Sequence, residues 1–285
     1  MAPILPQIVG TPCVLTPALT DAADEIRIGP DGVLWVQVGG ELFRYEADGE
    51  AAGCSLQGTR VWQDTGFDAI TDFDLDDAGR PTLLVFFSEI VRLSTAGAVE
   101  FSCEGPSGQG VAVSGAGDRA YIVPVGADTL TWVDIGVGDC AKAPTSLKLA
   151  SAISTAPVAA GANLAVDHHD PSNALPPAVL IDVTTGAELT SIGLGTIDDQ
   201  EMAAVSDIVA IEDGFLVAES PGGDLWRVAT DGTVAARWEA EPLLGFGDQD
   251  TINIDSIAVR AGQQTYLSAS FLDTFGIWAV DLPSM

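Results

Sequence analysis

The sequence predicts an all-β protein, a six-bladed β-propeller built from four-stranded antiparallel blades. Three observations predict it. A strand–turn–strand unit recurs every 40 to 52 residues, glycine stands at most of its turns, and no convincing stretch has a helical period. The last unit lacks a fourth strand, while the chain begins with an unassigned strand. We therefore expect the N-terminal strand to close the last blade.

The repeated unit is an aliphatic strand, a turn and a second short strand in which apolar and polar residues alternate. Its copies begin at residues 42, 90, 130, 179, 225 and 277. Two further strands precede most copies, as in EIRIGPDGVLWVQV, which turns at Asp31-Gly32. The fourth unit is the least regular. Four strands and a period of this length are typical of a propeller blade.

We expect one domain over residues 1–285, in which segment 8–17 is the closing strand. The six blades are expected at about 24–57, 69–105, 110–144, 153–194, 205–240 and 252–285. An open ring would leave sheet edges and apolar faces exposed, which favours closure. The alternative is a pair of β-sandwiches, but six near-equal units with a completing N-terminal strand are awkward to divide between two sandwiches.

The chain is both apolar and strongly acidic. Of its 285 residues 47% are hydrophobic and 18% charged, and the formal net charge is −30. Disorder requires low hydrophobicity together with high charge, so the composition favours a folded core. A charge of this sign repels phosphate backbones and anionic lipids, so we expect no nucleic-acid partner. No stretch of 18 uninterrupted apolar residues occurs, so no membrane span is expected.

The beginning of the chain carries no targeting signal. It lacks a basic region and contains four prolines in its first 17 residues, and the whole chain has only two lysines. We expect an exported protein, extracellular or periplasmic, whose leader is absent here; a cytosolic protein is the alternative. A monomer is expected.

The four cysteines are Cys13, Cys54, Cys103 and Cys140, and all fall near outermost strands. An even number in an exported protein suggests two disulfides. Outer strands of neighbouring blades diverge, however, and a disulfide needs Cα atoms within about 7 Å. Either the cysteines pair just beyond the strands, with Cys13–Cys54 and Cys103–Cys140 nearest in sequence, or they are separate thiols.

The strand–Asp-Gly–strand units resemble those of six-bladed propellers of the NHL, SMP-30 and strictosidine-synthase-like kind. The resemblance covers nearly the whole chain through generic hairpins, and it implies architecture. Members of this group include calcium-dependent lactonases and esterases, a Pictet–Spengler condensing enzyme and interaction modules. The resemblance therefore implies either a binding module or a hydrolase.

Four carboxylates are expected at one level of the central channel. Counting seven residues back from the glycine that ends each inner strand leads to Glu25, Asp72, Asp207 and Asp255. Clustered carboxylates repel one another, so one protonates or a cation joins them. Oxygen-rich, sulfur-free sites suit Ca²⁺. These four residues are our candidate calcium ligands; the alternative is that acidic residues merely cap turns there.

A second candidate site lies in AVDHHDP, residues 165–171, which holds both histidines. On a strand Asp167 and His169 would share a face and could help to bind Zn²⁺ or Ca²⁺. The alternative is a polar surface strand. No GxSxG, P-loop, HExxH or CxxC motif accompanies it.

These observations favour an exported acidic β-propeller that acts as a binding module through its loop face and central channel. The partner would be a protein, a glycan or a small ligand. The alternative is a Ca²⁺-dependent lactonase- or esterase-like hydrolase with a carboxylate-lined channel mouth. Trp62 and Trp238, at outer positions, are expected to be exposed and could belong to a recognition surface.

Overall fold

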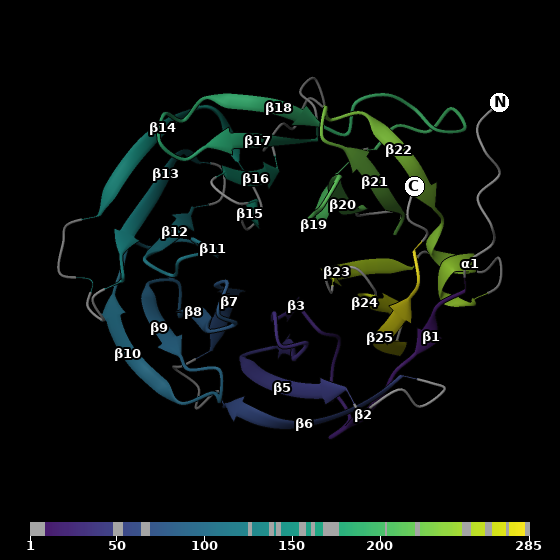
Figure 1. Cartoon of the computed structure of the whole chain (residues 1–285), viewed down its shortest axis with the longest axis horizontal. Coiled ribbons are helices and arrows are strands. Elements are labelled where there is room, and N and C mark those ends of the chain that lie inside the picture. The colour runs from purple at the N-terminus through teal and green to yellow at the C-terminus, as the bar shows by residue number, and fades with distance from the viewer. Residues whose placement is uncertain are drawn as a thin grey trace.

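The protein is a closed ring of six blades around a central axis (Figure 1). The computed structural model describes residues 9–47, 54–63, 69–124, 127–136, 140, 144–153, 158–160, 163–167, 177–202, 204–219, 223–246, 252–259, 264–271 and 274–282. The all-β, six-bladed fold predicted from the repeats is confirmed.

Each blade is a meander that runs from the axis to the rim. Blade 1 contains β3 (Glu25–Ile28), β4 (Leu34–Val38), β5 (Glu41–Ala47) and β6 (Ser55–Trp62). Blade 2 contains β7 (Ile70–Leu75), β8 (Pro81–Val85), β9 (Glu89–Leu93) and β10 (Val99–Glu104), and blade 3 contains β11 (Gly110–Val113), β12 (Arg119–Val123), β13 (Ala127–Asp134) and β14 (Thr145–Ile153). Blade 4 contains β15 (Val158–Ala160), β16 (Asn163–Asp167), β17 (Ala178–Asp182) and β18 (Glu188–Ile192). Blade 5 contains β19 (Val205–Ile211), β20 (Gly214–Glu219), β21 (Leu225–Ala229) and β22 (Val234–Trp238). Blade 6 contains β23 (Asn253–Val259), β24 (Thr265–Phe271), β25 (Thr274–Val280) and the short β1 (Thr11–Pro12).

The position of a strand in its blade explains its composition. The second strands β4 and β8 are buried at every residue because neighbouring blades cover both of their faces. The outermost strand β10 alternates exposed and half-buried residues, because only one of its faces meets protein. Apolar clusters fill the spaces between blades; one of them joins Trp35 and Leu42 of blade 1 to Phe73 and Leu83 of blade 2.

The turn that follows the first strand shows why Asp-Gly marks these hairpins. Gly32 has φ +79°, in the left-handed region that glycine occupies without a steric penalty. The Asp31 carboxylate accepts a hydrogen bond from the Val33 amide at 3.1 Å. The pair therefore supplies both the backbone conformation and a partner for a turn amide.

The N-terminal segment closes the ring, as predicted, but it does so in two parts. Thr11 and Pro12 pair antiparallel with Ala279 and Trp278 and complete blade 6. The next strand, β2 (Val14–Thr16), pairs in parallel with β6 and adds a fifth strand to blade 1. The expected closing strand 8–17 is thus a clasp that spans two blades.

Two disulfides join the rims of neighbouring blades. Cys13 is bonded to Cys54 with Cα atoms 4.4 Å apart, and Cys103 is bonded to Cys140 with Cα atoms 5.8 Å apart. The outermost strands follow one another around the rim. The end of the outermost strand of one blade therefore lies beside the segment that precedes the outermost strand of the following blade. Leu194, after β18, forms a bridge with Thr233, before β22, in the same way. This geometry resolves the conflict between cysteine number and strand divergence in favour of the two disulfides.

One short helix, α1 (Ala240–Leu244), follows the outermost strand of blade 5. It packs with Trp238 in the cluster between blades 5 and 6, and Trp238 is only 7% exposed. The expectation that Trp238 is exposed is therefore wrong. No helix among the described residues is long and apolar enough to cross a membrane.

Candidate functional site

Three of the four candidate carboxylates converge near the axis. Glu25, Asp72 and Asp207 lie at or near the start of the inner strands β3, β7 and β19, and each is at most 9% exposed. Inner strands begin where the chain arrives from the preceding blade. We call this end of the ring the loop face, and it also carries the turns between the second and third strands of each blade.

Asp255 does not join them. It stands at a bulge of β23, between the paired residues Ile254 and Ser256, and the neighbour that takes the place of Asp72 and Asp207 is Ser256. Asp255 forms a hydrogen bond with Ser270, and burial followed by the charge of Asp24 raises the pKa of its carboxyl.

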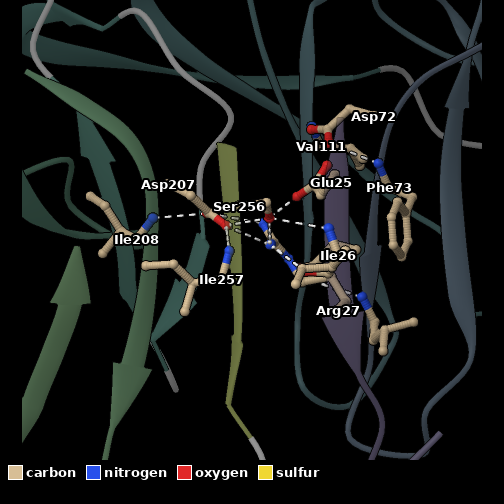
Figure 2. Close-up of polar contacts among 12 residues, drawn as sticks. Glu25, Ile26, Arg27, Asp72, Phe73, Val111, Asp207, Ile208, Ser256 and Ile257 are labelled. Carbon is tan, nitrogen blue, oxygen red and sulfur yellow. Dashed lines mark hydrogen bonds and ion pairs between the residues drawn. The ribbon is translucent and has the colours of Figure 1, made fainter. Parts of the chain in front are cut away.

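The centre of the site is an arginine that sequence reasoning missed. Arg27 extends from β3 toward blade 5, where its Nη1 lies 3.0 Å from the Asp207 carboxylate (Figure 2). It also contacts Glu25 directly, and its Nε lies 4.0 Å from Asp74. Only 11% of its side chain is exposed. Glu25, Arg27, Asp72, Asp74, Asp207 and Ser256 are called the axial cluster below.

Acids of the axial cluster accept backbone amides of the next blade at two places in the ring. Asp72 and Asp74 of β7 accept hydrogen bonds from Val111 (2.6 Å) and Val113 (2.8 Å) of β11. In the same way Asp207 of β19 accepts one from Ile257 of β23 at 2.8 Å. An inner strand has no neighbouring strand on the side that faces the axis. The backbone amides on that edge therefore need hydrogen-bond acceptors from elsewhere. The acidic side chains of the preceding blade supply them.

A serine continues this pattern across the joint that the clasp closes. Ser256 Oγ donates to Asp207 at 2.6 Å and accepts from the Ile26 amide at 3.1 Å. Figure 2 shows this line of contacts from blade 5 through blade 6 to blade 1. These hydrogen bonds give the cluster a structural role in holding the ring together.

Burial dominates the protonation of the acids. It raises the pKa of Glu25 well above its usual value, against the opposing charge of Arg27, and Glu25 shares a hydrogen bond with Asp72. Burial also raises the pKa of Asp72, and it raises the pKa of Asp74 to about 7. Burial opposes the charge of Arg27 as well, but Asp207 and the other acids around it hold its pKa above the usual range.

The protein should be more stable at pH 5 than at pH 8. Between pH 3.8 and about 7 folded Asp74 keeps a proton that the unfolded chain has lost, so stability falls as pH rises through this window. The expected loss from this residue is about 2–3 kcal/mol between pH 5 and 8, and Glu25 acts in the same direction.

Urea unfolding at several pH values measures this slope. The Asp74→Asn variant imitates the protonated carboxyl and should remove the share of this residue, about 2–3 kcal/mol between pH 5 and 8. A variant slope equal to that of the wild type would show that the pH dependence arises elsewhere.

The residues predicted as metal ligands do not form a metal site among the described residues. No group of three or more His, Cys, Asp or Glu side chains that could hold a metal ion occurs within the described ranges. The oxygens of Asp72 and Asp207 already accept backbone amides. Asp167 is the last residue of β16, while His168 and His169 lie outside the described residues.

The loop face carries a second unusual feature, the turn between β8 and β9. Phe86 and Phe87 have φ +46° and +66° and are 57% and 48% exposed. The Ser88 amide donates to Val85 O at 3.1 Å, which closes a type I′ turn. A left-handed conformation costs a residue with a β-carbon about 1–2 kcal/mol. From the sequence Phe87 is expected on a strand, packed between blades. That expectation is wrong, because Phe87 lies in the turn with its side chain exposed.

Comparisons with solved structures agree with the propeller fold. The chain is similar to a chain in the crystal structure of the mitotic checkpoint complex, with a TM-score of 0.60 and 10% identity over 98% of this chain and 94% of that one. It is also similar to the Cps50 (Swd1) β-propeller domain of Myceliophteria thermophila, with a TM-score of 0.57 and 11% identity over 93% and 98% of the two chains. A protein of unknown function from Bacteroides caccae has a TM-score of 0.57 and 10% identity over 83% and 85%.

These identities show the fold alone. No family model matches the chain, and no curated protein matches it. The resemblance to propellers of the NHL kind therefore extends to the architecture, and no family is assigned.

Proposed function

We propose that the protein is an exported, non-enzymatic β-propeller that binds a protein partner through its loop face. The observation that carries this proposal is the Phe86–Phe87 turn, because two large apolar side chains stand exposed there on a strained backbone. Strain of this kind clusters at sites of recognition, where surrounding structure holds it in place. One chain of similar fold belongs to the mitotic checkpoint complex, a protein assembly, which agrees with such a role.

The axial cluster supports a scaffold role for the centre of the ring. Its carboxylates accept hydrogen bonds from neighbouring blades and balance Arg27. A Ca²⁺-dependent hydrolase, the alternative function, would need these same oxygen atoms as metal ligands or bases. Two disulfides between blades support export, since such bonds persist in oxidising compartments.

Cross-linking mass spectrometry of complexes captured from the producing cells and their medium tests the proposal. Cross-links should map to the loop face, at residues 86–88, 105–109 and 193–202. The turns of the opposite face, at residues 29–32, 76–79 and 114–118, should carry none. If a glycan or a small ligand were the sole bound species, the proposal of a protein partner would be wrong.

Enzyme assays test the alternative function, a calcium-dependent hydrolase. The purified protein should not hydrolyse lactones or aryl esters in millimolar CaCl₂, and chelation should leave its melting temperature unchanged. Hydrolysis that is lost in the Asp72→Asn variant, together with stoichiometric calcium, would establish the hydrolase and overturn the proposal.

A further inference from the structure

The Phe86–Phe87 turn is held rigidly by the loops around it. The Phe86 amide donates to Ala69 O and the Phe87 amide to Thr71 Oγ1, both at 3.0 Å. Phe87 O accepts a hydrogen bond from the Gly108 amide at 2.8 Å. These contacts come from the start of β7, the residue before it and the connection that leaves blade 2, so the turn cannot relax without disturbing them. The two rings lie 6.2 Å apart and form one compact apolar protrusion.

The choice of residues in this turn is unfavourable for the isolated protein. Type I′ turns favour Asn-Gly, which adopts positive φ readily. Another turn of the described chain, Asp198–Asp199, has φ +52° and +61° and uses aspartates, which tolerate this conformation. The side chains of Phe86 and Phe87 stay about half exposed, so their burial does not offset the cost of the left-handed backbone. Their side chains therefore suit contact with something outside the chain.

Acidic side chains stand beside the protrusion. Glu89 follows the turn and pairs directly across the strands with Glu104, and both are exposed. Like charges placed opposite each other on neighbouring strands repel. A lysine or arginine between them would relieve this repulsion, so the charge that follows the turn favours a cation from a partner.

We propose that Phe86 and Phe87 are the anchor of the partner-binding surface, and that the partner is a protein with an apolar pocket rimmed by lysine or arginine. This inference rests on the proposed function and names the residues and the chemistry of its interface. Large aromatic side chains that fill a desolvated pocket carry most of the energy of many interfaces. The net charge of −30 disfavours a second copy of this chain and anionic membranes as occupants.

The double variant Phe86→Asn/Phe87→Gly separates recognition from folding. It installs the dipeptide that the turn favours, so its melting temperature should equal or exceed that of the wild type. The partner is first captured by photo-crosslinking with p-benzoylphenylalanine at position 87, and then purified. Its dissociation constant should rise about 100-fold or more with the double variant. The matched control is Val99→Asn, at an exposed residue (57%) at the opposite end of blade 2, and it should change the dissociation constant less than twofold.

Charge provides a second measurement. The Glu89→Gln/Glu104→Gln variant should weaken binding several-fold at low salt and reduce its dependence on salt. Equal salt dependence in this variant and the wild type would overturn the basic rim.

The remaining outcomes distinguish the two proposals. A partner that cross-links elsewhere on the loop face and binds the double variant with unchanged affinity would overturn the anchor and leave the proposed function standing. Failure to capture any protein on the loop face would overturn both. Sedimentation of the wild type, but not the double variant, with phosphatidylcholine vesicles would identify a membrane as the occupant and overturn the protein pocket.

Discussion

Replacing Arg27 by methionine should lower the free energy of unfolding by about 3–5 kcal/mol at pH 8. The substitution removes the cation that faces Glu25, Asp74 and Asp207 and leaves these acids buried without it. Methionine retains much of the length and apolar volume of the arginine stem, so the loss reports on charge more than on packing. For a chain of this size the melting temperature should fall by about 5–10 °C.

The pH dependence of the loss identifies its cause. At pH 5 more of the buried carboxyls are protonated, so the difference between variant and wild type should shrink. Arg119→Met is the matched control, because Arg119 also stands on a strand beside an acid, Asp134, but is 44% exposed. It should cost about 1 kcal/mol or less. A cost for Arg27→Met that matches this control, or does not vary with pH, would contradict the role given to the axial cluster.

The axial cluster has a consequence for recognition. Because acids of blades 2 and 5 accept amides of blades 3 and 6, the inner strands of these two pairs are fixed relative to each other at the end where the loops emerge. The same β7 strand that supplies Asp72 and Asp74 also supplies Thr71, which holds the Phe86–Phe87 turn. The interior acids thus help to position an exterior protrusion through one strand.

The blades could be predicted from the sequence because each is a local structure. Hairpins join residues close in the chain, so their alternation and turn residues are visible in a short window. The closure was predicted for a related reason, since a missing strand at one end matched an extra strand at the other. The split of this segment between two blades was not visible, because Thr11–Pro12 and Val14–Thr16 pair with strands that only the closed ring brings together.

The acidic register was predictable in part. The count from glycine leads to equivalent positions at Asp72 and Asp207, but it fails in blade 6. In blade 6 the same count leads to Asp255, one residue before Ser256. Arg27 had a signal that was overlooked, because it stands two residues after Glu25 on the same face of its strand.

Other features depend on tertiary contacts alone. Nothing local shows that α1 covers Trp238, so its burial could not be predicted from its outer position in the repeat. The left-handed Phe86–Phe87 pair contradicts local preference, and it persists because Ala69, Thr71 and Gly108 bond to it. Such conflicts between local preference and structure are expected at functional surfaces.

The clasp and an apolar core between the blades together hold blade 6 against blade 1. The Gly10 amide donates to Leu243 O, the Cys13 amide to Ile277 O and the Tyr45 hydroxyl to Pro17 O, at 2.6, 2.7 and 2.9 Å. A cluster of apolar residues from both blades, among them Ile26 and Ala258, packs inside the joint. Without the clasp this core would lie beside two open strand edges.

Deleting residues 1–18 should therefore open the ring. The deletion removes β1, β2 and the Cys13–Cys54 disulfide, exposes the edge of β25 and frees Cys54. We expect a large loss of soluble protein and a broad, less cooperative unfolding transition, measured by calorimetry and by sedimentation.

The contribution of the disulfide can be measured separately, because the Cys13→Ser/Cys54→Ser variant keeps both strands. With sequence separations of 41 and 37 between their cysteines, the two disulfides should each contribute about 4 kcal/mol through chain entropy. The matched variant Cys103→Ser/Cys140→Ser therefore sets the reference, and the deletion should cost clearly more than either cysteine pair. A deletion variant with unchanged melting temperature and solubility would show that the core of the joint closes the ring without its clasp.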